Sequence, residues 1–249
     1  MTEIRTFPNP SEPIRTSLNP SEPLRTSQNP SEPVVPMPAA LRARVAADYA
    51  PVRPLAAPLV RAMWVLPLMA LSLLAAPLVF DLRPDAARLG WSGTWGVSTA
   101  QAAVGLALVV AALREAVPGR GWSSRAATVW LVVPIVMVVA VTLTVWSASP
   151  IRLVNGWWIV GAMCFAGSAS SALPVVALAS ILAARAYPTR PALAGALLGL
   201  GAGLVADAGW RLFCHFSQPS HVLMAHLGGV IVAAAAGAVL SSSLARRSR

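Results

Sequence analysis

The sequence predicts an all-α integral membrane protein, in which a six-helix transmembrane bundle follows a disordered, proline-rich amino-terminal tail. Composition is the first reason: 56% of the 249 residues are hydrophobic and only 11% are charged, whereas a soluble domain carries about 25% charged residues. The second reason is a set of six long apolar runs, each able to cross the roughly 30 Å core of a bilayer. The mean hydropathy of +0.66 agrees with both.

Residues 1–36 form the predicted disordered tail. Three copies of a decapeptide follow one another in it: Arg5–Ile14, Arg15–Leu24 and Arg25–Val34. Their shared core, Pro-Ser-Glu-Pro, leaves almost no apolar side chains that successive repeats could bury against one another. Segments of this composition stay disordered, with polyproline character.

Residues 37–61 are predicted to be a cytoplasmic segment, made of an amphipathic helix and a proline-rich linker. The helix is expected over Pro38–Tyr49. Its apolar residues recur every four positions: Leu41, Val45 and Tyr49. Such a helix can rest on anionic lipid headgroups or dock into the groove of a partner protein. The prolines of Ala50–Pro58 predict that the linker is stiff and not helical.

Residues 62–245 are predicted to form the transmembrane domain, with a basic cytoplasmic tail over 246–249. The six apolar segments are, approximately, Ala62–Phe80, Gly96–Leu113, Ala127–Ser147, Trp158–Ala184, Ala192–Phe213 and Val222–Leu244. Prolines fall inside three of them, at positions 67, 77, 134 and 174. Transmembrane helices tolerate such kinks when neighbouring groups satisfy the freed carbonyls.

Arginine placement predicts the orientation of this domain. The net charge of +10 comes from 19 basic residues, all arginine, against 9 acidic ones. With the amino terminus in the cytoplasm, fifteen arginines fall in cytoplasmic segments and four in outer ones. The positive-inside rule therefore places both termini in the cytoplasm. In a soluble protein this charge would suggest nucleic acid, but topology explains it here, and no direct nucleic-acid partner is expected.

The fifth apolar segment carries both a packing signal and a buried acid. Small residues at 195, 199 and 203 are spaced to let a second helix approach closely in lipid. Asp207 is an intramembrane carboxylate, and such groups are functional candidates by default. Arg211 follows one turn later, so an i, i+4 ion pair that neutralises Asp207 is the favoured interpretation. A proton relay is not expected, because the spans contain no lysine and no second deep carboxylate.

The two cysteines are expected at one membrane face. Cys164 precedes Arg185 by 21 residues and Cys214 follows Arg190 by 24, which in helices correspond to about 31 and about 36 Å. If both arginines lie at the inner face, both thiols reach the outer face at nearly the same height. A disulfide, a soft-metal site and two inert side chains all remain open. Two histidines could join Cys214 as metal ligands: His215 and His221.

Three other functions are considered. A serine hydrolase built on Ser168, Ser170 or Ser171 is discounted, because serine commonly binds helices together in lipid. A small transporter or channel would need a polar cavity or inverted repeats, and neither is visible in the sequence. A quinone-linked thiol oxidoreductase normally relays electrons through nearby cysteine pairs, and two single cysteines far apart in the chain argue against it. The transporter or channel stays the main alternative.

Several short motifs occur in a characteristic order along residues 38–245. They are Ala50–Leu55 (APVRPL), Ala116–Arg120 (AVPGR), Cys164, Tyr187–Gly195 (YPTRPALAG) and Cys214 beside a histidine. Together they resemble the NrsF family of bacterial inner-membrane proteins, the negative regulators of sigma F. One departure is the sequence after the second cysteine, Phe213–Gln218 (FCHFSQ), because family members tend to have histidine before that cysteine and acidic residues after it.

The resemblance implies a non-enzymatic, six-span anti-sigma factor that holds an extracytoplasmic-function sigma factor at the membrane and releases it under stress. It implies that Cys164 and Cys214 sense metals or oxidants, with no resident cofactor apart from a transient soft-metal ion at these thiols. The implied sigma-contacting residues are Leu41, Val45, Tyr49, Val52, Arg53 and Leu55. Our hypothesis is that metal binding or oxidation shifts the fourth and fifth spans and moves the Tyr187–Arg190 turn between them.

Overall fold

The computed structural model describes residues 38–48, 54–152 and 157–247. The chain divides into two compact units, residues 1–53 and residues 54–249. The predicted disordered tail over 1–36 lies outside the described residues, as do Tyr49, Val52 and Arg53.

The first unit contributes one described helix, α1 (Ala39–Asp48). A helix is confirmed where the four-residue apolar period predicted one. Leu41 is 50% exposed and Val45 is 52% exposed, so these two side chains of the apolar stripe are open to their surroundings among the residues that the structure describes. An exposed apolar stripe on a short helix is a surface that lipid or a partner protein can cover.

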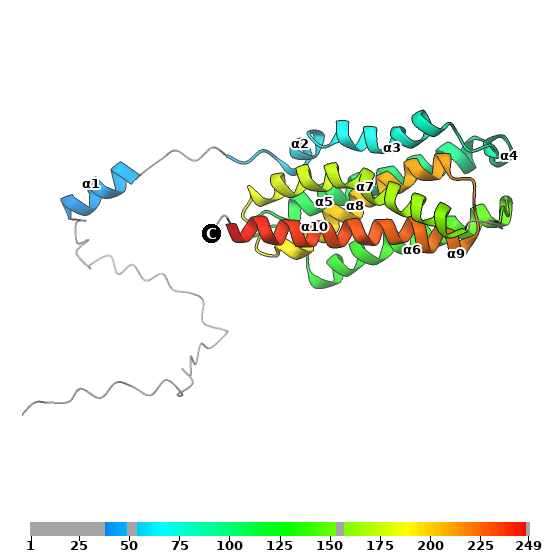
Figure 1. Cartoon of the computed structure of the whole chain (residues 1–249). Helices are drawn as coiled ribbons and strands as arrows, with labels where there is room; N and C mark the ends of the chain where they lie inside the picture. Colours follow the sequence, from blue (N-terminus) through cyan, green and yellow to red (C-terminus); the bar gives the residue numbers. More distant parts are fainter. Residues whose placement is uncertain (1–37, 49–53, 153–156, 248–249) are drawn as a thin grey trace, which may run out of the picture. The chain divides into compact units, whose positions relative to one another are not determined.

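The second unit is the predicted six-span bundle, and its six helical stretches are long and apolar enough to cross a membrane. Its elements are α2 (Pro58–Met63), α3 (Leu66–Phe80), α4 (Ala86–Trp91), η1 (Ser92–Gly96), α5 (Val97–Glu115), α6 (Ser124–Ala148), α7 (Trp157–Ala184), α8 (Pro191–Phe213), α9 (Pro219–His221), η2 (Val222–Leu227) and α10 (Gly228–Arg247). Here η marks a π-helix. The spans lie side by side along a common direction (Figure 1).

Several of the predicted segment ends differ from the observed ones. The first span begins at Pro58 inside the predicted linker, because proline is tolerated in the first turn of a helix. It is interrupted at Trp64 and Val65, just before Pro67. The second and sixth spans begin about ten and about three residues earlier than predicted, where short helical turns and π-helices extend them through less apolar sequence.

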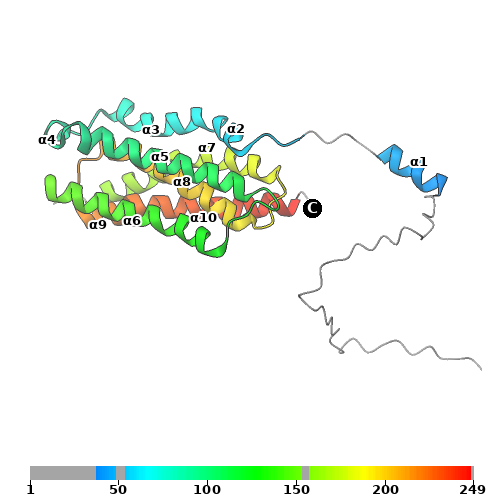
Figure 2. The same cartoon turned by 180° about the vertical axis from the view of Figure 1, so that it is seen from behind.

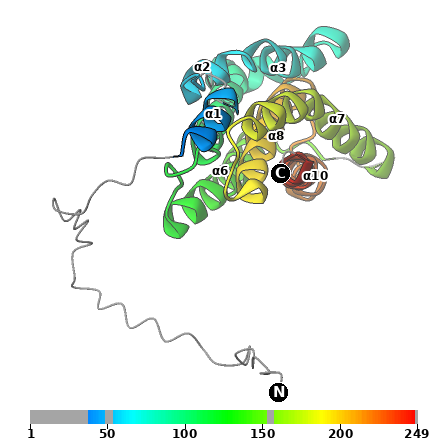
Figure 3. The same ribbon diagram turned by 90° about the vertical axis from the view of Figure 1, so that its left-hand side faces the viewer.

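Helix α8 lies at the centre of the bundle, with other helices around it when the bundle is viewed along its length (Figure 3). It packs against α10, α5, α7 and α3. From behind, α5 runs along α8 (Figure 2). Nearly every residue of α8 between Ala194 and Leu212 is buried.

The predicted face of small residues on α8, at positions 195, 199 and 203, packs against α10. Added Cβ atoms at Gly195 and Gly199 would collide with the backbone carbonyls of Gly237 and Ala233. Gly105 of α5 and Gly201 of α8 approach each other's carbonyls in the same manner. Glycine therefore sets the distances between the central helix and two of its neighbours.

The end of the bundle where α2 begins and α10 ends is held together by a buried arginine and by an ion pair to a buried carboxylate. Arg61 of α2 is buried and donates hydrogen bonds to two carbonyls, those of Leu113 at 2.7 Å and Leu182 at 3.2 Å. Arg190, at the start of α8, pairs with the buried Glu115 at 2.5 Å. These contacts join the helix that follows the linker to the carboxyl-terminal ends of α5 and α7.

We predict that Gly199→Ala destabilises the bundle by about 1–3 kcal/mol, because the new methyl group must push α8 and α10 apart. Thermal unfolding in detergent measures this change. Gly161→Ala is the matched control, since a Cβ atom at Gly161 of α7 meets nothing within 4 Å. Equal melting temperatures for the two variants would contradict this packing.

Candidate functional site

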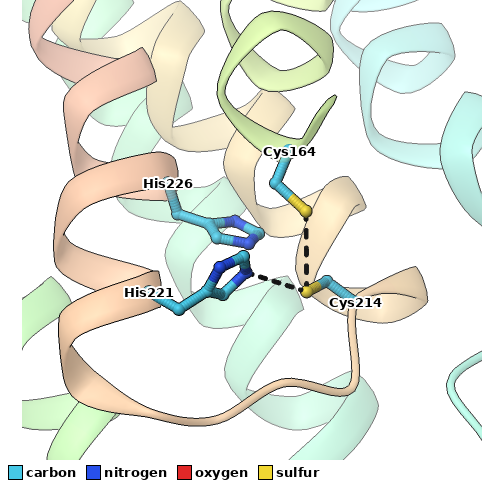
Figure 4. Close-up of side chains that lie close together, drawn as sticks. All are labelled: Cys164, Cys214, His221 and His226. Atoms are coloured by element: carbon cyan, nitrogen blue, oxygen red, sulfur yellow. Dashed lines mark hydrogen bonds between the residues drawn. The ribbon is translucent and has the colours of Figure 1, made fainter. Parts of the chain in front are cut away.

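Four potential metal ligands meet at the end of the bundle opposite Arg61, which we call the cysteine end. Cys164 lies near the start of α7, and Cys214 directly follows the last residue of α8. At Cys214 the backbone leaves the helix, with φ −71° and ψ 115°. Pro219 then begins α9, which brings His221 and His226 back toward the two thiols (Figure 4).

The ligand atoms are close together and buried. The sulfur atoms of Cys164 and Cys214 are 3.7 Å apart, and Cys214 Sγ lies 3.4 Å from His221 Nε2. One potential ligand atom from each of the four residues lies within 4.8 Å of the others. The four side chains are shielded from solvent, with residue exposures between 1% and 8%.

The π-helix η2 accounts for the placement of the two histidines. On an α-helix, residues five apart point about 140° away from each other, at 100° per residue. A π-helix closes hydrogen bonds between residues five apart and so brings them onto one side. His221 directly precedes this turn and His226 lies inside it, and the centroids of their rings are 5.4 Å apart.

His226 is held by the buried Asp207 of α8. Its Nδ1 lies 2.8 Å from Asp207 Oδ1, while the other carboxylate oxygen accepts from Gln101 at 2.7 Å and from Arg211 at 2.8 Å. The predicted ion pair between Asp207 and Arg211 is confirmed. The Nε2 atom of His226 is buried and has no hydrogen-bond partner in the described part of the chain.

The structure brings together some predicted site residues and not others. Cys164, Cys214 and His221 meet, at the common depth that the helix lengths predicted. His215 lies outside this group, with its ring against Phe216 at a centroid distance of 4.1 Å. The two cysteines, expected to be too far apart for a thiol oxidoreductase, are 50 residues apart in the chain but only 3.7 Å apart in space, so that expectation is wrong.

A second polar cluster fixes the backbone around Cys214. Arg83, in the turn between the first two spans, donates to Asp85 at 2.6 and 2.9 Å. The backbone N–H of Arg83 donates to the Leu212 carbonyl at 2.8 Å, and its guanidinium reaches the His215 carbonyl at 3.4 Å. The turn therefore holds the chain on both sides of Cys214.

Two kinds of chemistry suit this arrangement. Two thiolates and two imidazoles are ligands for borderline and soft cations. The two thiols could also lose two electrons and two protons to an oxidant and form a disulfide. For that, the sulfur atoms must close from 3.7 Å to about 2.05 Å.

Comparison with known proteins decides the family. The family model described as NrsF, negative regulator of sigma F, matches residues 45–246, which is most of the chain. The chain belongs to the NrsF family. Searches of curated proteins and of solved structures found no match.

Membership confirms the family to which the motifs pointed. NrsF proteins are negative regulators of sigma F, so a sigma factor is the partner that the family implies. The matched residues include the last part of α1 and all six spans. The structure adds that both cysteines of this NrsF protein lie at one end of the bundle, in contact with each other.

We predict that Asp85→Asn lowers the free energy of unfolding by about 1–2 kcal/mol at neutral pH, because the charged hydrogen bonds with Arg83 are lost. Burial alone would raise the pKa of Asp85, but hydrogen bonds and charge from Arg83, with a hydrogen bond from Ser149, hold that pKa below its ordinary value. The stabilisation is therefore complete above the unfolded-state pKa of about 3.9 and is lost as the pH falls through the lower folded-state pKa.

Thermal unfolding in detergent as a function of pH measures this difference. Asp81→Asn removes the same charge from an exposed position four residues away and is the matched control. A destabilisation by Asp85→Asn that stayed constant down to the lowest pH would contradict the role of the ionised carboxylate.

Proposed function

We propose that this NrsF protein is an inner-membrane anti-sigma factor that sequesters an extracytoplasmic-function sigma factor and releases it when Cys164 and Cys214 bind a metal or are oxidised. The family match carries the regulatory part of the proposal. The contact between the two thiols supports the sensing part, because separate inert cysteines would not need to meet inside one ligand cluster.

Helix α1 is the part of the chain that we assign to sigma-factor binding. Leu41 and Val45 are exposed on it, one turn apart. Arg42 and Arg44 are exposed beside them, which suits a partner groove with acidic residues at its rim. Leu55 of the linker is also 43% exposed. We place α1 in the cytoplasm, where sigma factors act, and the cysteine end at the periplasmic face.

The signal would travel along α7 and α8. Helix α7 carries Cys164 near its start and, near its end, the Leu182 carbonyl that accepts a hydrogen bond from Arg61. Arg61 belongs to α2, the first helix after the linker. A change in the distance between the two thiols would move α7 against α8. That movement would shift the Leu182 carbonyl and the ion pair between Arg190 and Glu115.

We predict that the double variant Leu41→Glu, Val45→Glu weakens sigma-factor binding by about tenfold or more, because two charges replace the apolar anchors. Co-purification of the sigma factor with the membrane protein measures this loss. Ala43→Glu adds a charge on a different side of α1 and should have little effect. Unchanged co-purification, with reduced binding of α1 to anionic vesicles instead, would show that the helix docks on lipid headgroups.

We predict that the double variant Cys164→Ser, Cys214→Ser still holds the sigma factor but no longer releases it when cells meet metal or oxidant stress. Transcription from a sigma-dependent promoter measures release. Ser170→Ala alters an exposed side chain on the same helix and serves as the control. Normal induction in the double variant would exclude these thiols as the sensor.

A further inference from the structure

The unpartnered nitrogen of His226 points to the ligand of this cluster. The His226 ring is 1% exposed, and its Nε2 atom lacks a hydrogen-bond partner among the residues that the structure describes. A buried polar atom without a partner is unfavourable, because its hydrogen bond to water is lost and not replaced. Figure 4 shows this ring directed toward the sulfur atoms and the ring of His221. A cation between these side chains would satisfy the nitrogen.

Asp207 determines which ring nitrogen of His226 is available. Its Oδ1 accepts the Nδ1–H of His226, which leaves the Nε2 lone pair free for a cation. Its Oδ2 is occupied by Gln101 and Arg211, and the Gln101 amide also donates to the Leu204 carbonyl at 3.1 Å. Side chains of α5 and α8 therefore hold the Asp207 carboxylate in place. Metal-binding histidines commonly donate their second N–H to such a carboxylate.

Two of the separations between ligand atoms match those around a tetrahedral cation, and the other ligand atoms, all within 4.8 Å of one another, would move closer on binding. With metal–sulfur bonds of about 2.3 Å and metal–nitrogen bonds of about 2.0–2.1 Å, a tetrahedral site has sulfur–sulfur separations of about 3.8 Å and sulfur–nitrogen separations of about 3.6 Å. The observed separations are 3.7 Å between the two sulfurs and 3.4 Å between Cys214 Sγ and His221 Nε2. A cavity of about 570 Å³ borders the His221 side of the cluster.

We propose that Cys164, Cys214, His221 and His226 form a closed, four-coordinate site for a divalent cation of the zinc class, such as Zn²⁺ or Cd²⁺, and that Asp207 is the positioning residue for His226. This deepens the proposed function, because it specifies the coordination at the thiols assigned there to sensing. Binding one cation releases the two thiol protons to solvent and leaves no open position for a substrate. His215 takes no part.

The test titrates the purified, reduced full-length protein in detergent with Co²⁺, followed by competition with Zn²⁺. We expect thiolate charge-transfer absorption together with the intense visible bands of tetrahedral Co²⁺. His226→Asn should lower the Co²⁺ affinity and alter the tetrahedral bands, because one ligand is lost while the Asn amide, at the position of Nδ1, keeps a donor for Asp207. His215→Asn is the matched control and should leave spectrum and affinity unchanged. Equal effects of the two histidine variants, or a wild-type spectrum without tetrahedral bands, would overturn the site.

Asp207→Asn separates positioning from ligation. The four ligands remain, so we expect the tetrahedral spectrum with an affinity about 10–100-fold lower. Because this variant leaves Arg211 without its counter-charge, Gln101→Leu provides a second test that keeps the ion pair, with an expected loss of about tenfold. Unchanged affinity in folded samples of both variants would overturn the role of Asp207.

These measurements contain no sigma factor, so their outcome is separate from that of the proposed function. Tight tetrahedral binding with metal-independent sigma release would overturn the proposed function and keep the site. Metal-dependent release through the thiols without tetrahedral binding would overturn only the site.

Discussion

One buried carboxylate dictates the organisation of the cysteine end. Asp207 is fully buried in the central helix, where an unpaired charge would be very unfavourable. The fold compensates with partners from three elements: Arg211 from α8 itself, Gln101 from α5 and His226 from η2. Arg211 supplies the counter-charge, and the hydrogen bond from His226 joins the sixth span to α8 at the same carboxylate. The ligand cluster follows from this requirement, because His226 can reach Asp207 only beside the two thiols.

The small residues of α8 make that arrangement geometrically attainable. Where Gly195 and Gly199 meet α10, and Gly201 meets α5, the backbones approach to a distance that no side chain would allow. Because the helices lie so near one another, side chains from several of them can reach the same carboxylate. The apolar packing of α8 and the polar network at its end are thus two consequences of the same short interhelical distances.

Much of this could be predicted from the sequence. Hydropathy predicted the six spans, and the helical rise predicted two thiols at one depth. The spacing of Asp207 and Arg211 predicted their ion pair, and the order of short motifs predicted the family. All of these depend on local composition or on regular helix geometry. The two thiols touch because α8 packs against its neighbours. These contacts join residues far apart in the sequence, so no local pattern predicts them.

His226 shows most clearly where sequence reasoning stops. Five residues from His221, it would face away from that histidine on an α-helix, and only the π-helical turn brings the two rings together. His215, adjacent to Cys214 in the chain, was favoured on proximity alone. Because the backbone is extended after α8, the His215 ring instead packs against Phe216. Glu115 was also missed, because its pairing with Arg190 joins the end of α5 to the residue before α8, 75 positions along the chain.

The central claim is that thiols at one end of the bundle control a sigma factor at the other. The most direct measurement reconstitutes the protein in vesicles with the sigma factor bound on one side and adds Cd²⁺ only to the cysteine side. We expect the bound sigma factor to dissociate from the wild-type protein and to stay on the variant without cysteines. If Cd²⁺ occupies the site and the sigma factor remains bound to the wild-type protein, the two ends are not coupled and the account is wrong.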